Sequence, residues 1–260
     1  MKKISIITPV YNAKDMLKRT LESVLRQDYT LIEHVVMDGG SSDGSVDLLE
    51  EYAKKYEQVG KKLIWASEKD DGMIDATNKA YRIASGDLFL FFSDIYANNH
   101  IISKIVAAFD EEDVDYTHGG LAYQRNGKII RAWNGKHGNW RLGWMAAHPT
   151  LCITRSVWEK HGPYLNKYLN AWDYEFEIKL FVDQSLKYKN FEEHLVIYYA
   201  GGTSNAGLKG KYRSIRDAYF ALRDNHIKFA FFVNLCKTIR GVFSYIFVKK
   251  KHINLEDWMK

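Results

Sequence analysis

The first hundred residues alternate between short apolar runs and longer segments with helical spacing. The apolar runs cover 4–7, 32–37, 62–66 and 88–92, and the helical segments cover 14–26, 45–58 and 73–84. Short strands joined by helices of this length imply right-handed crossovers and a parallel sheet that is covered on both faces. Because ligands bind beyond the carboxyl ends of strands in such sheets, we expect the loops after these runs to form one site.

The composition is that of a globular enzyme with a full core. Of the 260 residues, 46% are hydrophobic and only 3 are proline. The two cysteines, Cys152 and Cys236, lie far apart and in no metal-like spacing. This argues against a disulfide framework or a zinc site and is typical of a reducing compartment. No signal-peptide pattern follows Met1, so we expect a cytoplasmic protein.

Beyond residue 100 the pattern is less regular, and we expect mixed strands there. The helical stretches cover 100–109, 174–186 and 209–226, and the strand-like runs cover 115–123, 128–133 and 194–199. The net charge is +5, and the basic residues are concentrated late in the chain. Because no recognised nucleic-acid module appears, we expect the anionic partner to be a diphosphate or a membrane surface and not a nucleic acid.

Polar strings follow three of the apolar runs. They are Thr8-Pro9-Val10-Tyr11-Asn12, Asp38-Gly39-Gly40-Ser41-Ser42-Asp43-Gly44 and Glu68-Lys69-Asp70-Asp71-Gly72-Met73-Ile74-Asp75-Ala76-Thr77-Asn78-Lys79-Ala80. Together they resemble the family 2 glycosyltransferases, although Ile74, Thr77 and Ala80 depart from the tyrosine, methionine and glycine common there. The resemblance covers about residues 1–205. It implies an α/β fold of the GT-A type, with a mainly parallel central sheet, and a nucleotide-sugar donor.

The resemblance implies a donor-binding role for residues on all three strings. Thr8, Pro9 and Tyr11 would wall the base of a nucleotide-diphospho-sugar, for which a UDP-sugar is expected, and Asp38 and Asp70 would hydrogen-bond the nucleoside. Tyr11 offers a stacking face, and a carboxylate accepts hydrogen bonds from a ring N–H or from ribose hydroxyls. Asp38 is also typical of an Asx turn, and that alternative stays open.

Two further polar residues are expected near the donor. Asn78 would face it from the start of a helix, and His148, in a His-Pro element like one near the family's site, would contact the diphosphate or the acceptor. A lone histidine is as often structural, so both interpretations of His148 stay open. For Asp43 we favour a helix-capping role. Asp75 and Lys79, at i and i+4, suit a surface ion pair.

The metal motif of the family is short in this chain. Asp94 offers a single carboxylate in the run 91–96, where relatives show a longer acidic string. The resemblance implies that Asp94 binds Mg²⁺ or Mn²⁺, which would bridge the donor phosphates and neutralise the leaving diphosphate. Because the motif is short, a nucleotide-sugar-binding protein without transferase activity is the alternative function.

The acidic string 170–177 supplies the candidate catalytic base. Asp173 matches the family's base, which would deprotonate an acceptor hydroxyl as it attacks the anomeric carbon, with inversion. Asp173 is also typical of a helix N-cap, which is the competing structural interpretation. The resemblance implies a saccharide acceptor, lipid-linked, in the assembly of capsule, exopolysaccharide or lipopolysaccharide.

The C-terminal segment has helical spacing with two distinct sides. Its apolar side carries Phe229, Phe232, Cys236, Ile239, Phe243 and Phe247, and its other side carries Asn234, Lys237, Gly241 and Ser244. Each charge at a bilayer centre would cost about 2.5–3.5 kcal/mol, which disfavours a spanning helix. We expect a helix that lies on the inner face of the plasma membrane or one that caps the domain.

The expected organisation is one catalytic domain followed by a short appendage. The glycosyltransferase domain would cover 1–226, with a nucleotide-binding half at 1–100 and an acceptor half at 101–226. The amphipathic basic segment would cover 227–260.

Overall fold

A computed structural model of the chain describes residues 1–92, 94–125, 128–199 and 208–246. The strands are β1 (Ile4–Val10), β2 (Ile32–Asp38), β3 (Lys62–Ser67), β4 (Leu88–Phe91), β5 (Ile95–Tyr96), β6 (Tyr116–Arg125), β7 (Lys128–Trp133), β8 (Cys152–Thr154) and β9 (Tyr188–Tyr199). The helices are α1 (Lys14–Leu25), α2 (Ser45–Gln58), α3 (Met73–Ile83), α4 (Ile101–Glu111), α5 (Arg155–His161), α6 (Trp172–Val182), α7 (Leu208–Asp224) and α8 (Ala230–Ile246).

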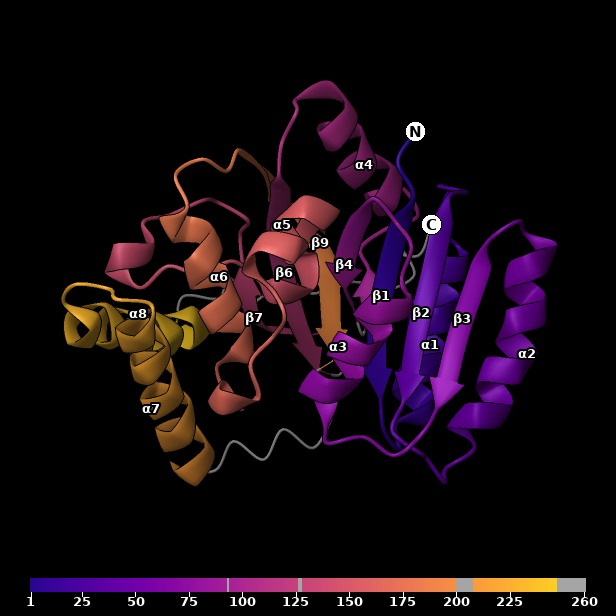
Figure 1. The fold of residues 1–260 in the computed structure, drawn as a ribbon, viewed down its shortest axis with the longest axis horizontal. Helices are drawn as coiled ribbons and strands as arrows, with labels where there is room; N and C mark the ends of the chain where they lie inside the picture. The colour runs from indigo at the N-terminus through magenta and orange to yellow at the C-terminus, as the bar shows by residue number, and fades with distance from the viewer. Residues whose placement is uncertain (93, 126–127, 200–207, 247–260) are drawn as a thin grey trace.

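The described strands form one sheet in the order β3-β2-β1-β4-β8-β6-β9-β5, with β7 paired to β6 (Figure 1). β1 pairs in parallel with β2 and β4, and β2 with β3, because helices cross over between these strands. Beyond β4 the sheet is mixed, since β8 is antiparallel to β4 and β6 whereas β6 and β9 are parallel. The expected parallel half followed by mixed strands is confirmed.

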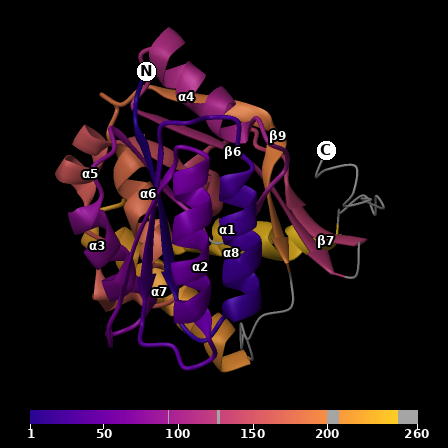
Figure 2. The same cartoon turned by 90° about the vertical axis from the view of Figure 1, so that its right-hand side faces the viewer.

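Successive residues of β1 enter two different cores. Ile6 packs in the core beneath α1 and α2, and Ile7 packs in the core beneath α3, α5 and α6. Both side chains are fully buried, because the pleat of a strand points neighbours to opposite faces and helices cover both faces here. Figure 2 shows the strands between the two helix layers. Because helices cover both of its faces, β1 lies at the centre of the fold between the two cores.

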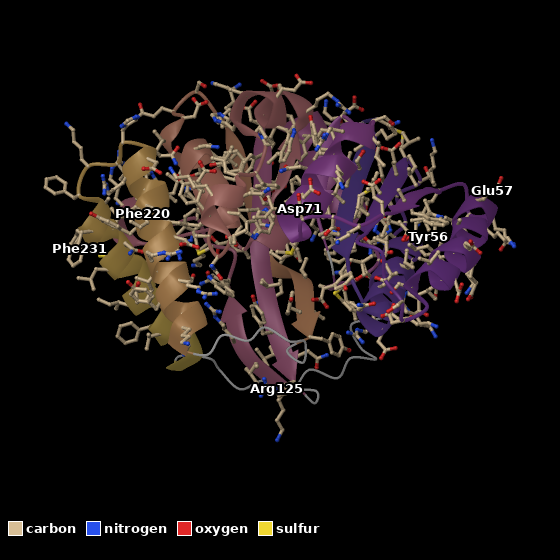
Figure 3. All side chains as sticks on the ribbon, turned by 60° about the horizontal axis from the view of Figure 1, so that its bottom comes forward. Tyr56, Glu57, Asp71, Arg125, Phe220 and Phe231 are labelled. Carbon is tan, nitrogen blue, oxygen red and sulfur yellow. The ribbon has the colours of Figure 1, made fainter. Side chains whose placement is uncertain are left out.

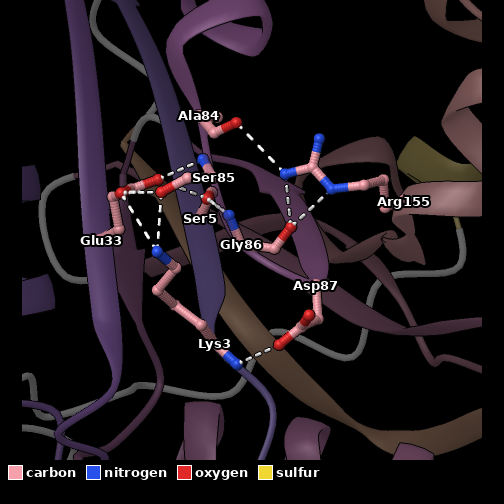
Figure 4. Close-up of polar contacts among 8 residues, drawn as sticks. All are labelled: Lys3, Ser5, Glu33, Ala84, Ser85, Gly86, Asp87 and Arg155. Atoms are coloured by element: carbon pink, nitrogen blue, oxygen red, sulfur yellow. Dashed lines mark hydrogen bonds and ion pairs between the residues drawn. The ribbon is translucent and has the colours of Figure 1, made fainter.

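A polar cluster ties the amino ends of the central strands together (Figure 4). The Glu33 carboxylate accepts hydrogen bonds from Ser5 Oγ at 2.8 Å and from Ser85 N at 2.6 Å. Burial raises the pKa of Glu33, but the hydrogen bonds from Ser85 and Ser5 outweigh it and hold that pKa below its usual value. Arg155 donates to the carbonyl oxygen of Gly86 beside them. The cluster is structural, and it leaves the opposite edge of the sheet to the polar strings.

Helix α6 begins and ends earlier than the sequence predicts. It spans 172–182, whereas the expected helix covers 174–186. The Asp183 carboxylate accepts hydrogen bonds from Ser185 N at 3.1 Å and from Ser185 Oγ at 2.6 Å, and this local turn ends the helix. The earlier start brings Asp173 into the first turn.

β9 and α5 also differ from the expected elements. β9 begins at Tyr188 and pairs with β6 along most of its length, whereas the expected strand covers 194–199. α5 has no counterpart among the expected elements, because seven residues are too few to display a helical apolar period. Thr154 caps it by accepting a hydrogen bond from Val157 N.

Helices α7 and α8 form a hairpin that packs against α6 at one end of the molecule (Figure 1). The hydrophobic cluster there joins Ile178 of α6, Leu222 of α7 and Val233 of α8. Asn234 is buried in the same interface and donates from Nδ2 to Ile215 O at 3.0 Å. Phe247 lies outside the described residues. Within those residues, every helix is too short or too polar to span a membrane.

Candidate active site

Parallel strands bring the polar strings to one edge of the sheet. In the strand register, Val10 lies beside Asp38, and Asp38 lies beside Ser67. The loops after β1, β2 and β3 therefore start next to one another. Figure 3 looks toward this edge, with Asp71 near its centre.

Asp38 combines a structural role with an unused acceptor atom. Its Oδ2 accepts hydrogen bonds from Gly40 N at 3.2 Å, Ser41 N at 2.9 Å and Ser67 Oγ at 2.6 Å. The Asx-turn interpretation is therefore correct for this oxygen. Oδ1 is buried and has no hydrogen-bond partner. An unpaired buried carboxylate oxygen costs free energy, so Oδ1 is available to accept a hydrogen bond from a ligand.

Asp70 lies against the backbone that follows Asp38. A Cβ atom added to Gly39 would lie 2.7 Å from Asp70 Oδ2, so any larger residue there would push this carboxylate away. Asp70 Oδ1 accepts a hydrogen bond from Gly72 N at 2.8 Å. The two predicted nucleoside-binding carboxylates thus belong to adjoining loops.

The loop after β1 is fastened to the loop after β2. Asn12 N donates to Ser41 Oγ at 2.7 Å, and Asn12 Oδ1 accepts from Ser42 N at 2.9 Å. Tyr11 is 64% exposed, which leaves its ring free to stack on a planar ligand, and Pro9 beside it is partly buried. The predicted base-binding wall therefore stands next to Asp38.

Two of the predicted donor-site side chains make contacts within the protein. Thr8 is fully buried, and its Oγ1 donates to Phe92 O and lies 2.9 Å from His34 Nε2. Asn78 Nδ2 donates to Tyr164 O at 2.9 Å, and Asn78 Oδ1 accepts from Tyr164 N at 3.1 Å. In this structure Thr8 thus supports the end of β1 and Asn78 joins α3 to the segment after α5, and their donor-binding roles stay predictions.

The structural interpretation of Asp75 and Lys79 is confirmed, and that of Asp43 needs a correction. Gly44, and not Asp43, occupies the N-cap position of α2, and Asp43 Oδ1 accepts from Ser45 N at 3.0 Å from just outside the helix. Lys79 Nζ lies 3.1 Å from Asp75 Oδ2, the expected i,i+4 ion pair, and 2.8 Å from Glu68 Oε1.

His148 is buried in an aromatic cluster at the end of β4. Its Nε2 lies 2.8 Å from the Tyr164 hydroxyl, and its ring stacks on Phe91 and meets the edge of Trp172. Burial lowers the pKa of His148 to about 4, although the charge of Asp173 opposes this. The imidazole is therefore neutral at pH 7, able to donate or accept a hydrogen bond but carrying no charge to pair with a phosphate.

Asp173 lies in the first turn of α6, close enough to this cluster that its charge acts on both His148 and Tyr164. Ala171, and not Asp173, occupies the N-cap position. Asp173 Oδ1 accepts from Tyr174 N at 2.8 Å, and the first turn of a helix favours a negative charge. The carboxylate is only partly buried, as a base that must reach an acceptor has to be.

Asp94 lies on the α1 side of the sheet and is 3% exposed. Its Oδ1 accepts one long hydrogen bond, 3.4 Å, from Tyr199 N. Burial raises the pKa of Asp94 to about 8, against the hydrogen bond from Tyr199 and the charge of Arg19. No cluster of three or more metal-ligating side chains occurs in the parts of the chain that the structure describes. Asp94 would thus be a single protein carboxylate at a metal site.

The sequence profile described as glycosyl transferase family 2 matches residues 5–174, more than half of the chain. The chain belongs to this family. The matched range contains the three polar strings together with Asp94 and Asp173, so the resemblance based on them is confirmed. Membership makes the protein a glycosyltransferase enzyme.

Curated relatives are similar over different parts of the chain. A "PGL/p-HBAD biosynthesis glycosyltransferase" of Mycobacterium bovis is 28% identical over 211 residues, covering 77% of this chain and 78% of the relative. The "Poly(ribitol-phosphate) beta-glucosyltransferase" of Bacillus spizizenii is 35% identical over 125 residues, covering 46% of this chain and 19% of the relative.

Solved structures confirm the GT-A fold. The mannosyltransferase PcManGT of Pyrobaculum calidifontis, in complex with GDP-Man and Mn²⁺, has a TM-score of 0.64 at 15% identity, covering 91% of this chain and 69% of that one. TarS of S. aureus, residues 1–349 with UDP-GlcNAc, has a TM-score of 0.63 at 19% identity, covering 85% and 66%. At these identities the likeness establishes the fold of this glycosyltransferase and not its substrates.

The site of this glycosyltransferase also contains residues that sequence reasoning did not assign. Tyr164 contacts both Asn78 and His148, and Glu177 lies one turn after Asp173. Glu177 stands in the acidic string, where its spacing from Asp173 is the signal that could have identified it. Tyr164 carries no such signal, because an irregular segment brings it to the site.

Proposed function

We propose that this protein is an inverting glycosyltransferase that moves a sugar from a UDP-sugar to a lipid-linked saccharide in the assembly of a cell-surface glycan. The main support is the position of Asp173, a partly exposed carboxylate that lies beside the buried end of β4. Asp38, whose Oδ1 has no hydrogen-bond partner, lies at the same edge of the sheet. Relatives named for PGL and poly(ribitol-phosphate) synthesis support the acceptor class, and neighbours solved with UDP or UDP-GlcNAc support the nucleotide.

The donor half of the reaction uses the loops after β1, β2 and β3. Tyr11 and Pro9 flank the base, and Asp38 Oδ1 and Asp70 accept hydrogen bonds from the nucleoside. Thr8 and Asn78 support these loops from behind, through Phe92 and Tyr164. Neutral His148 donates or accepts one hydrogen bond at the diphosphate or the acceptor.

The acceptor half uses Asp173 as general base. The acceptor hydroxyl oxygen forms a bond to the anomeric carbon while the bond from that carbon to the diphosphate oxygen breaks. The hydroxyl proton passes to the Asp173 carboxylate, and the nucleoside diphosphate leaves with the bonding electrons. Attack from the side opposite the leaving group inverts the anomeric centre.

The Asp94 carboxylate is the kind of ligand that Mg²⁺ or Mn²⁺ prefers, but it is only one ligand. The carboxylate is a hard oxygen ligand with one long hydrogen bond, and burial disfavours its ionised form more than the charge of Arg19 favours it. Donor phosphates and water would have to supply the other ligands. Such a cation would neutralise the charge of the leaving diphosphate.

We also propose that the enzyme docks on an anionic membrane through α7 and α8. Large apolar side chains point to solvent on α8, where Phe231 is 71% exposed and Val242 58%, and just before it, where Phe229 is 83% exposed. Phe220 and Phe231 both lie at this end of the molecule in Figure 3. Exposed cations on the same hairpin include Arg213, Lys228 and Arg240. An apolar face flanked by cations matches a surface of acyl chains below anionic headgroups.

Calorimetric titration with UDP-, GDP- and dTDP-sugars tests the donor site. A UDP-sugar should bind the wild type, and Asp38→Asn should weaken binding by roughly tenfold to a hundredfold, because a hydrogen bond to a charged group contributes about 1.5–3 kcal/mol. Asp43→Asn removes a charge of the same kind from the same loop and should leave the affinity unchanged. Equal effects of the two substitutions would rule out the assignment of Asp38, and binding without transfer would favour a binding protein.

A further inference from the structure

Tyr164 and His148 meet inside the aromatic cluster at the end of β4. The Tyr164 hydroxyl lies 2.8 Å from His148 Nε2, and the two rings make an edge contact with their centres 5.6 Å apart. Both side chains are buried. Phe91 stacks on the imidazole, and the edge of Trp172 meets it with ring centres 4.9 Å apart. Aromatic rings therefore surround this hydrogen bond.

The segments that carry the two side chains are each anchored by other hydrogen bonds. Asn78 on α3 binds the backbone of Tyr164 twice, from Nδ2 to Tyr164 O at 2.9 Å and from Tyr164 N to Oδ1 at 3.1 Å. His148 begins a single turn of 3-10 helix that ends at Thr150. Thr150 Oγ1 accepts from Gly119 N of β6 at 3.0 Å. The fold thus fixes the hydroxyl and the imidazole in contact.

The hydroxyl proton of Tyr164 has one acceptor. Within the residues that the structure describes, the hydroxyl makes its hydrogen bond to His148 Nε2 and no other. If Nε2 carried a proton, that N–H would donate to the hydroxyl oxygen and the buried O–H would donate to nothing, which costs free energy. Burial, together with the charges of Asp173 and Glu177, raises the pKa of Tyr164 well above its usual value, so the hydroxyl keeps its proton. Tyr164 therefore donates to an unprotonated Nε2.

The single proton of the neutral imidazole then lies on Nδ1. Nδ1 has no hydrogen-bond partner among the described residues, and it is not one of the buried polar atoms that lack a partner. Nδ1 is therefore the ring nitrogen that solvent or a ligand can reach. The ring to which it belongs contacts Trp172, the residue before Asp173.

We propose that Tyr164 is a positioning residue that holds His148 in the Nδ1–H tautomer, so that the imidazole donates a hydrogen bond to the diphosphate of the sugar donor. This inference rests on the proposed transferase function. An ionised diphosphate oxygen only accepts hydrogen bonds, and its charge grows as the bond to the anomeric carbon breaks. The acceptor hydroxyl is a poorer partner, because its oxygen needs a lone pair for the attack and its proton passes to Asp173. His148 keeps its own proton throughout.

Nitrogen NMR of isotope-labelled histidine tests the tautomer without ligand or turnover. Protonated and unprotonated ring nitrogens have different shifts, and the signals of His148 are those missing from His148→Asn. At pH 7 the wild type should show a protonated Nδ1 and an unprotonated Nε2. Tyr164→Phe keeps the ring and removes the hydroxyl, so both tautomers should be populated and the two shifts should approach each other.

Tyr116→Phe is the matched control for the NMR experiment. It removes a hydroxyl from the same hydrophobic cluster, where the Tyr116 ring stacks on Tyr188, and it should leave the His148 shifts unchanged. A protonated Nε2 in the wild type would overturn the role of Tyr164. An unchanged tautomer in Tyr164→Phe would overturn it as well.

Calorimetric titration with UDP and with uridine tests the partner of Nδ1. Tyr164→Phe should weaken the binding of UDP by roughly twofold to tenfold, because only part of the population then presents the N–H donor. Uridine has no diphosphate, and its affinity should stay that of the wild type. Equal weakening of both ligands, or unchanged binding of UDP, would overturn the diphosphate contact. Failure of the wild type to bind either ligand would instead overturn the proposed donor site, and the diphosphate contact with it.

Discussion

At the scale of single residues, the site depends on carboxylates that the fold treats differently. Asp38 has one oxygen engaged in a turn and the other unpaired. Glu177 is fully buried, and burial raises its pKa well above the usual value, whereas Asp173 is partly exposed. Asp94 is buried with a pKa raised to about 8. In the proposed reaction, identical chemical groups would serve as a ligand acceptor, a buried neighbour, a base and a metal ligand because their surroundings differ.

Asp94→Asn should stabilise the protein in the absence of ligands. The folded pKa of Asp94, about 8, lies above the usual 3.8, so its contribution to stability is fully present below pH 3.8 and is lost as the pH rises through 8. The asparagine variant does not ionise, and its advantage over the wild type should grow across this window by no more than about 1.4 kcal/mol per pH unit. Urea denaturation at several pH values measures the difference.

Addition of Mn²⁺ with a UDP-sugar supplies the matching test of the metal site. The cation should raise the urea midpoint of the wild type and leave that of Asp94→Asn unchanged. If the difference in stability between the wild type and Asp94→Asn does not change with pH, then burial does not raise the pKa of Asp94. Equal stabilisation of both proteins by Mn²⁺ would place the metal elsewhere.

At the scale of elements, α8 buries one side and leaves large apolar side chains exposed on the other. Val233 and Asn234 pack inward, whereas Phe231 and Leu235 are exposed. A helix that only caps a domain turns its apolar side to the core. The exposed side chains of α8 instead leave an apolar surface that water disfavours. This surface of the C-terminal hairpin is the proposed membrane contact.

Phe231→Ser with Leu235→Ser should weaken membrane binding without loss of fold. Co-flotation with vesicles that contain phosphatidylglycerol should fall by roughly tenfold or more, because burying each of these side chains contributes about 1.5–3 kcal/mol. Binding of the wild type should also fall with added salt, since the cations of the hairpin act through charge.

Val59→Ser with Leu169→Ser is the matched control for this experiment. These side chains are 48% and 65% exposed and lie outside the hairpin. Their loss should leave flotation unchanged. If both double variants float like the wild type, the apolar side of α8 does not contact lipid.

At the scale of the whole molecule, the sheet brings the proposed donor-binding loops and the proposed catalytic base to the same edge. Its parallel half could be predicted from sequence, because β1, α1, β2 and α2 each display their own period within a few residues. The mixed half could not. β8 has only three residues and lies between β4 and β6, and such a pairing between distant segments leaves no local pattern.

The site divides in the same way. Asp38, Asp70, Asp94 and Asp173 stand in strings that local sequence displays, so a family resemblance was enough to nominate them. Tyr164 reaches Asn78 and His148 through an irregular segment, and no spacing along the chain predicts those contacts. The candidate site residues within the matched range could therefore be predicted from sequence. The contacts that Tyr164 makes could be found only in the structure.

The most direct test of the account is the stereochemistry and base dependence of transfer. Wild type and Asp173→Asn would be incubated with the UDP-sugar that binds and a panel of alkyl glycosides, and the product would be examined by NMR. The account predicts an anomeric configuration opposite to that of the donor, and a loss of turnover of about a hundredfold or more in the variant with unchanged donor affinity. A product with retained configuration, or full turnover by Asp173→Asn, would contradict it.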